Sequence, residues 1–291
     1  MNSKALYIFT RTPLHVGAGT TVGAIDQPVA REKHTGFPVI PGSAIKGVLA
    51  DGSAYLDRSS GERTTLGRDL FGHEKPEDDD AKSGSIAFGE AKLLAFPVRS
   101  AKGCFAWVTS SLILERWKRD TGGTVTLPQA PLGALDIYGD AATLGLPEPQ
   151  PGAGQGQPEQ VKFVLEDYVL DHRGGFDGTA GLAELLGAPG QSESLWSSLC
   201  TRHLCLVSND MMSHFARNAC EVAPHVTISD QTGTAEDRKL FNQENVPAET
   251  LFYAVISELR DGKLSGLAVP PIVQIGGDAT TGHGFCTTRL V

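Results

Sequence analysis

Short apolar runs of strand-like character recur along the chain, separated by segments rich in glycine and proline. The run ALYIFT at 5–10 predicts a strand that leads into a long loop, HVGAGTTVGAID. Residues 83–100 alternate like strands, with breaks expected at Gly89 and Pro97. Further strands are predicted for VKFVLEDYVL, LCLVSND and TLFYAVISEL, and a last strand follows the glycine-rich segment IGGDATTGHG.

Helical patterns are fewer and do not alternate regularly with the strands. The segment AIKGVLADGSAYL predicts a helix with Ser43 as its N-cap. FAWVTSSLILERWK predicts a strand running into a helix, and GLAELLGA and SLWSSLCTRHL predict two more helices. Residues 222–244 predict a β-hairpin with its turn near 230–233. Because regular βαβ spacing is missing, the pattern favours an α+β fold over a doubly wound sheet.

The length of 291 residues allows one large domain or two small ones. No apolar run reaches the roughly 18 to 20 residues of a membrane span, and no signal-peptide cleavage pattern follows the first strand. The five scattered cysteines form no CxxC pair, which argues against a secreted disulfide scaffold. We therefore expect a cytoplasmic protein without a membrane partner.

The net charge of −9 argues at first against a nucleic-acid partner, but its distribution changes that picture. Residues 1–50 carry five basic and two acidic side chains, and residues 89–120 carry six and three, so each segment has a net charge of +3. The acidic residues gather in EKPEDDD and in a segment that opens with GLPEPQPGAGQGQPEQ. We expect flexible loops at 74–82 and 145–160. The basic segments are able to face an anion, although ordinary mixed surfaces give the same counts.

The segment GFPVIPGSAIKG at 36–47 is the first candidate binding site. A helix start places free backbone N–H groups and the positive end of the helix dipole near Lys46, which suits a phosphate. The spacing is not that of a Walker A motif, so nucleotide hydrolysis is not implied. An ordinary capped helix explains the same residues equally well.

The loop that holds His15 and Asp26 and continues to Arg31 is the second candidate. An Asp beside basic groups in a loop is able to bind a divalent ion or to assist proton removal from a ribose hydroxyl. A turn or cap residue is the more common role of a lone loop Asp. The loop's glycines lack the GxGxxG spacing and no helical pattern follows, which excludes a Rossmann dinucleotide site.

The segment GGDATTGHG at 276–284 is the third candidate, because glycine amides approach an extended anionic chain closely. Tight turns use the same residues. Cys200, His203 and Cys205 cluster without a second pair of ligands, so buried thiols are favoured over a structural zinc.

Six segments resemble, in order and spacing, one known family: TPLHVGAG, IDQPVARE, HTGFPVIPGSAIKG, FPVRSAKGCFAWVT, NVPAETLFYAVI and IGGDATTGHGF. They are similar to the repeated backbone subunit of the type III-B (Cmr) CRISPR effector complex, a member of the RAMP superfamily. The resemblance runs from about Tyr7 to the C-terminus. It departs mainly in the acidic loop and in the Pro/Gly/Gln segment.

The resemblance implies a modified RRM-like (ferredoxin-like) palm over 1–291 as a single domain, with a β-hairpin thumb at about 205–250. It implies that copies of the chain stack into a helical filament along a guide RNA, together with other Cmr subunits. Single-stranded target RNA pairs with the guide, and the thumb interrupts that duplex at regular intervals. The target is cut at those interruptions.

The resemblance also assigns roles to residues. IDQPVARE places the catalytic Asp at Asp26, which is then also the expected ligand of a divalent ion, Mg²⁺ or Mn²⁺. His15 is a candidate for an assisting role. Contacts to the guide RNA are expected from the helix start and from both loops: Ser43, Lys46, Arg31, Gly276, Gly277, Thr280, Thr281 and Gly282.

Two alternatives stay open on the sequence. In the first, the chain is a scaffold that binds guide RNA, Asp26 is a turn residue, and another subunit cuts. In the second, a stand-alone enzyme holds a phosphate ligand at the helix start of 43–46, although no further catalytic cluster accompanies it. RNA cleavage by the adjacent 2′-hydroxyl needs mainly an in-line geometry, which fits a sequence without a dense catalytic cluster.

Overall fold

The computed structural model describes residues 2–19, 23–74, 81–129, 132–139, 161–176, 204–228, 234–260 and 262–291. The predicted helix GLAELLGA, nearly all of SLWSSLCTRHL, the hairpin turn and most of the two predicted flexible loops lie outside these residues. The chain divides into two compact units, Met1–Leu93 with Cys220–Val291, and Leu94–Ala219. The single domain expected over 1–291 stays a prediction.

The first unit is built on an antiparallel sheet with the strand order β14-β15-β1-β13-β4. Its central strand β1 (Ser3–Thr10) is buried from Leu6 onward and lies between β13 (Leu251–Glu258) and β15 (Phe285–Leu290). The edges are β14 (Ile272–Gln274) and β4 (Ile86–Phe88). The predicted strands ALYIFT and TLFYAVISEL are confirmed, because continuous apolar runs suit strands buried on both faces.

Helix α1 (Gly42–Ala50) begins earlier than the sequence predicted. Pro41 is its N-cap, and Ser43 lies exposed in the first turn without capping the helix, so the prediction of Ser43 as N-cap is wrong. Gly42 explains the shift, because a Cβ at this position would overlap the carbonyl oxygen of Phe88 in β4. Only glycine lets the helix start pack this closely on the strand. The helix then buries Ile45 and Leu49.

The remaining elements of this unit flank the sheet. Helix α2 (Thr65–Phe71) is capped by the Thr64 hydroxyl, which accepts a hydrogen bond from the Gly67 N–H at 3.1 Å. A short hairpin pairs β2 (Leu56–Asp57) with β3 (Glu62–Arg63). Along the chain, the 3₁₀ turn η2 (Leu264–Gly266) precedes β14 and the 3₁₀ turn η3 (Ala279–Thr281) follows it.

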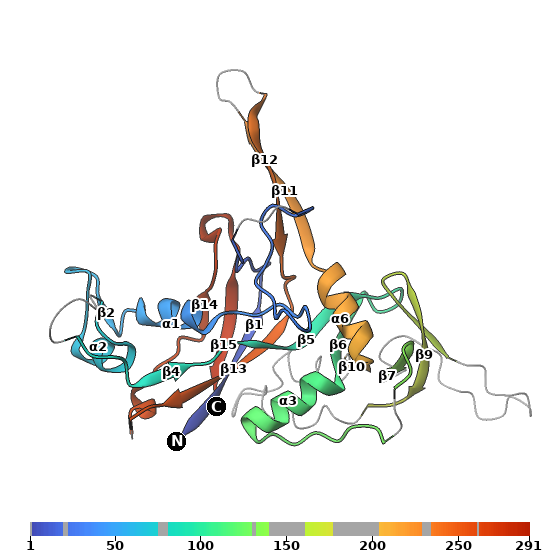
Figure 1. The fold of residues 1–291 in the computed structure, drawn as a ribbon, viewed down its shortest axis with the longest axis horizontal. Helices are drawn as coiled ribbons and strands as arrows, with labels where there is room; N and C mark the ends of the chain where they lie inside the picture. Colours follow the sequence, from blue (N-terminus) through green and yellow to red (C-terminus); the bar gives the residue numbers. More distant parts are fainter. Residues whose placement is uncertain are drawn as a thin grey trace, which may run out of the picture. The chain divides into compact units, whose positions relative to one another are not determined.

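The predicted hairpin at 222–244 is confirmed as a long two-stranded ribbon. Strand β11 (Glu221–Ile228) pairs antiparallel with β12 (Ala235–Asn245), in a register that sets Glu221 opposite Asn245 and shifts near Ile228. Figure 1 shows the ribbon extending well beyond β1 and β15 of the same unit. Of the range of about 205–250 expected for the thumb, residues 205–207 lie in a strand and residues 209–218 in a helix of the second unit. The thumb itself stays a prediction.

The second unit has a mixed sheet with the strand order β5-β6-β10-β7-β9-β8. The β6–β10 and β7–β9 pairs are parallel and the others antiparallel. Two helices follow strands directly, α3 (Ser111–Thr121) after β6 and α6 (Asn209–Asn218) after β10. The strands are β5 (Lys92–Arg99), β6 (Phe105–Ser110), β7 (Asp136–Tyr138), β8 (Lys162–Leu165), β9 (Tyr168–Gly174) and β10 (Leu204–Val207).

Two details of the second unit differ from the sequence prediction. Pro97 does not break β5 but lies opposite Trp107 within the β5–β6 pair, because its fixed φ suits an extended strand and only one donor is lost. VKFVLEDYVL is not one strand but the hairpin β8–β9, in which Glu166 adopts a left-handed φ of 49°. The mixture of sheets and helices confirms the predicted α+β class.

The packing at Gly42 predicts opposite effects for two glycines of α1. Gly42→Ala should destabilise the isolated chain by about 1–3 kcal/mol, because the added methyl group overpacks the contact with Phe88. Gly47→Ala is the matched control: no atom lies within 4 Å of its added Cβ, so removing a helical glycine should stabilise by up to about 1 kcal/mol. Urea unfolding of both variants measures the difference, and equal midpoints would contradict this account of the packing.

Candidate functional site

The base of the β11–β12 hairpin is where segments far apart in the sequence meet. The loop after β1 contacts the end of β12 twice, through an antiparallel bridge between Leu14 and Val246 and a parallel bridge between Gln27 and Gln243. The two limbs of this loop also pair with each other, Gly17 with Val29. The loop that holds His15 and Asp26 is therefore paired with the end of hairpin strand β12 through backbone bridges.

Asp26 and His15 both bind the backbone of β12. The exposed Asp26 accepts the Asn242 N–H at its Oδ2, at 2.8 Å. His15 Nδ1 lies 2.7 Å from the carbonyl oxygen of Glu244, and because a carbonyl only accepts, Nδ1 must be the donor. In a neutral ring this leaves Nε2 as an acceptor. Between them, the Gln27 N–H donates to Asn242 O at 3.1 Å, and the Glu244 N–H donates to Gln27 O at 2.9 Å.

The two side chains thus lie along one edge of one strand. The Asn242 nitrogen and the Glu244 oxygen are separated by two to three residues of extended chain, roughly 7–9 Å. Among the described residues, the second carboxylate oxygen of Asp26, Oδ1, has no hydrogen-bond or ion-pair partner. One carboxylate oxygen and one imidazole nitrogen are therefore available at neighbouring points of this edge.

Arg31, expected to contact the guide RNA, points into the protein. Its guanidinium donates to Glu244 Oε1 at 2.5 Å and to the carbonyl oxygen of Gly36 at 2.7 Å, and lies 3.2 Å from the sulfur of Cys220. The Glu244 side chain is 4% exposed, so the ion pair is nearly buried. Burial raises the pKa of the Cys220 thiol to about 12 despite the nearby guanidinium, so the thiol is neutral.

The glycine-rich loop at 276–284 packs directly on the His15 segment. The Gly277 N–H donates to His15 O at 3.0 Å, and the Gly284 N–H donates to Pro13 O at 2.8 Å. At Gly276, φ is 83° and a Cβ would overlap His15 O, so glycine is required twice over. The loop's exposed outer side includes Thr280 and Thr281.

Asp278 links this loop to the hairpin. It adopts a left-handed φ of 59°, and its carbonyl oxygen accepts the N–H groups of Thr281 and His283 at 3.1 and 3.2 Å. Its carboxylate accepts the side-chain amide of the buried Gln243 at 2.5 Å. Strand β12 therefore contacts the Asp26 loop with its outer backbone edge and the glycine-rich loop with a side chain.

Ser43 and Lys46 are not joined to this cluster. Neither side chain makes a hydrogen bond or an ion pair with any described residue. Ser43 is exposed and Lys46 is half-buried on α1. Both polar groups are thus available to an external partner.

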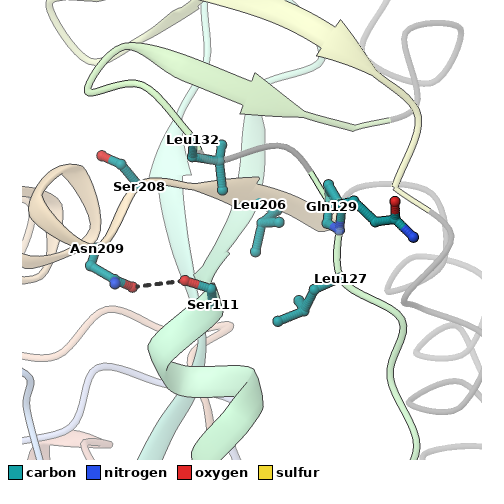
Figure 2. A pocket seen from close by; sticks show the side chains of 8 residues that line it. Ser111, Leu127, Gln129, Leu132, Leu206, Ser208 and Asn209 are labelled. Atoms are coloured by element: carbon teal, nitrogen blue, oxygen red, sulfur yellow. Dashed lines mark hydrogen bonds between the residues drawn. The ribbon is translucent and has the colours of Figure 1, made fainter.

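Within the described residues, no group of three or more His, Cys, Asp or Glu side chains is arranged to hold a metal ion. Of the cysteine and histidine cluster near residue 200, only Cys205 is described, and it is buried in β10. A cavity of about 380 Å³ lies in the second unit (Figure 2). Its lining contains no titratable side chain: Ser111, Leu127, Pro128, Gln129, Leu132, Leu206, Ser208 and Asn209.

The site residues of β12 were not predicted from the sequence. Asn242 and Glu244 organise the site through backbone groups, which carry no sequence signal. Glu244 also does so through a buried carboxylate, and the only hint in the sequence is a charged residue inside the polar strand end FNQEN. Such a residue is rarely fully buried unless it is paired, and its partner Arg31 lies more than 200 positions away.

Comparisons with known proteins identify the family to which the chain belongs. Residues 8–287 match the family model of the RAMP superfamily. The CRISPR system Cmr endoribonuclease Cmr4 of Pyrococcus furiosus is 30% identical over 306 aligned residues, covering 100% of this chain and 96% of the relative. The CRISPR system Cms endoribonuclease Csm3 of Streptococcus thermophilus is 36% identical over 91 residues, covering 28% of this chain and 40% of that protein.

Two solved structures show the same fold. Oligomeric Cmr4 from Pyrococcus furiosus superposes with a TM-score of 0.69 at 24% identity, covering 100% of this chain and 98% of the other. A chain of the type III-B Cmr-beta complex bound to cognate target RNA gives a TM-score of 0.68 at 17% identity, covering 100% and 97%. The chain belongs to the RAMP superfamily. None of the helices in the described part of the chain has the length and apolar character to cross a membrane.

The half-buried Cys220, whose thiol is desolvated beside Arg31, predicts a protected thiol. At pH 8, a pKa of about 12 instead of 9.0 lowers the thiolate fraction by about a thousandfold. Iodoacetamide should therefore label the exposed Cys104 long before Cys220 in the folded protein, as followed by peptide mass spectrometry. Because the thiolate fraction rises with pH, labelling of Cys220 should increase about tenfold per pH unit above 8. Equal labelling rates would contradict the burial of this site.

Proposed function

We propose that the chain is the guide-RNA-binding backbone subunit of a type III-B CRISPR effector complex and cleaves target RNA paired to the guide. The proposal is supported by membership of the RAMP superfamily and by a full-length relative that is named as a Cmr endoribonuclease. One observation on this chain supports it most directly. The exposed Asp26 carboxylate and the His15 imidazole both form hydrogen bonds with the backbone of β12, a strand of the projecting hairpin. If the chain were a non-catalytic scaffold, the placement of Asp26 beside His15 would have no function.

The chemistry follows from the position of the hairpin. A hairpin that enters a guide–target duplex turns a nucleotide out of the stack, which lets its 2′-hydroxyl align with the adjacent phosphate. The free Asp26 oxygen would receive the proton of the 2′-hydroxyl as its oxygen bonds to the phosphorus, or would orient that hydroxyl. The bond from phosphorus to the 5′-oxygen would break, and the departing oxygen would take a proton from water, with His15 Nε2 assisting the transfer. Sequence selection is left to base pairing, as in other RNA-guided systems.

A divalent ion, Mg²⁺ or Mn²⁺, is part of the proposal. The residues present fit an ion that takes one ligand from the protein and the others from substrate phosphates and water. Asp26 offers a single carboxylate oxygen, and no cluster of three ligands accompanies it among the described residues. Mg²⁺ is commonly held by one or two carboxylates together with substrate phosphates and water. Such an ion would stabilise the charge that develops on the phosphate during cleavage.

The guide RNA is expected to pass over α1 and the glycine-rich loop. Lys46 and Ser43 on α1 and the exposed Thr280 supply a cation and two hydroxyls for phosphates. The amides of Gly277, Thr281 and Gly282 donate within the protein, so at these positions and at Gly276 we expect close approach of the RNA backbone to the loop surface. Arg31 is paired with Glu244 and Gly36 inside the protein. Each copy makes a few contacts, and a filament of copies with other Cmr subunits sums them along one guide.

The RRM-like identity of the palm, a single domain over 1–291 and a cytoplasmic location are further parts of the proposal. The antiparallel sheet of the first unit, with helix α1 against β4, is compatible with such a palm. A reducing cytoplasm fits the four described cysteines, all of which are free thiols.

The substitution Asp26→Asn separates catalysis from anchoring, because the amide oxygen still accepts the Asn242 N–H while the charge is lost. In a reconstituted complex we expect normal guide loading and target binding, with cleavage at the regular sites reduced by about 100-fold or more. Asp26→Ala should be equally inactive, and EDTA should abolish cleavage by the unaltered complex. Full cleavage by Asp26→Asn would refute Asp26 as a catalytic carboxylate and favour the scaffold alternative.

Lys46→Ala tests the guide contact. We expect weaker guide binding. The slope of log K against log salt concentration should also become smaller by about 0.7–0.9 per copy, because the loss of one phosphate contact means that fewer counterions are released on binding. Lys4→Ala, at the exposed start of β1, is the matched control and should leave the slope unchanged. Binding titrations at several salt concentrations measure both, and an unchanged slope for Lys46→Ala would remove this residue from the guide path.

A further inference from the structure

We infer that Glu244, through its ion pair with Arg31, is a positioning residue that holds the Asp26 loop and His15 against the hairpin strand. The inference rests on the proposed function. The Arg31–Glu244 pair does not itself react, but it would fix the geometry of the groups that cleave the RNA.

Glu244 contacts both reactive segments at once. Its side-chain Oε2 accepts the Val29 N–H at 3.0 Å, three residues after Asp26, and its backbone N–H donates to Gln27 O at 2.9 Å. Its carbonyl oxygen accepts His15 Nδ1 at 2.7 Å. One residue of β12 therefore fixes the far end of the Asp26 turn and the tautomer of the imidazole.

Arg31 completes the arrangement from the other end of the loop. Its guanidinium binds the second carboxylate oxygen of Glu244, and donates also to Gly36 O at the turn that precedes α1. The residues between Asp26 and Arg31 are thus held at both ends by the same strand. A carboxylate that is 4% exposed needs this partner, because an unpaired buried charge is costly.

Simple structural stabilisation would also explain a buried ion pair, but it makes a different prediction. A pair that only stabilises the fold can be replaced by apolar side chains of similar size with little consequence. A positioning pair cannot, because the thioether sulfur of methionine is only a weak acceptor for the Val29 N–H. The Asp26 carboxylate would then be displaced relative to the hairpin, and such displacements are costly in rate.

The decisive variant is Glu244→Met with Arg31→Met, which removes both charges and keeps the volume. In the reconstituted complex we expect guide loading and the target dissociation constant to stay within about twofold, while the single-turnover cleavage rate falls about 10- to 100-fold. Hydrogen–deuterium exchange of the peptide containing residues 26–31 should become at least about tenfold faster, since its Val29 amide loses its acceptor.

Rescue provides the second readout. Glu244→Gln with Arg31→Met restores an acceptor for the Val29 N–H without restoring the charge, so it should regain part of the cleavage rate and of the exchange protection. This variant also serves if the double methionine variant does not assemble. The matched control is Arg99→Met with Glu166→Met, a second Arg–Glu pair at 3.0 Å in the other unit, which should change neither quantity.

The outcomes separate this inference from the function on which it rests. If Asp26→Asn is inactive but Glu244→Met with Arg31→Met cleaves at the normal rate, the positioning role is refuted and the function stands. If both cleave normally, the proposed function fails and the inference fails with it. A loss of cleavage without faster exchange at 26–31 would also overturn the positioning role.

Discussion

The constraint on which the site depends is the need of a strand edge for hydrogen-bond partners. Where β12 leaves the base of its hairpin, one edge faces β11 and the other would present unpaired N–H and C=O groups. From Asn242 to Val246 that outer edge is filled by one loop: by backbone groups of Leu14 and Gln27 and by side chains of His15 and Asp26. The candidate reactive groups are therefore part of the sheet-edge pairing, and their placement is set by backbone geometry.

The glycine-rich loop is tied into the same arrangement from the opposite side. It approaches His15 so closely that glycine is needed at 276, and Asp278 binds the buried amide of Gln243. A loop expected to follow the guide and a loop expected to act on the target thus share one strand. This is a physical reason for a single chain to combine guide binding with target cleavage.

Prediction from the sequence was most accurate where the pattern is local. The strands β1, β6 and β13, the helix after β6 and the hairpin all follow from runs of apolar residues or from turn residues between them. It failed at Ser43 because the contact between Gly42 and Phe88, which shifts the helix start, joins residues 46 positions apart. It failed at VKFVLEDYVL because a left-handed Glu166 is not marked by any glycine or asparagine. Within the site, Asp26 and His15 followed from the family resemblance, whereas Glu244 acts through contacts that no local pattern encodes.

The way in which Asp26 is held has a consequence for how freely the hairpin can vary. Its carboxylate binds the backbone N–H of Asn242, and every residue except proline supplies that group. The side chain at position 242 can therefore be exchanged without moving the carboxylate. The same freedom extends to the exposed apolar side chains of the ribbon, Val222, Val226 and Leu240, none of which takes part in the anchoring. The hairpin surface proposed to meet RNA is thus able to diversify while the proposed catalytic carboxylate stays in place.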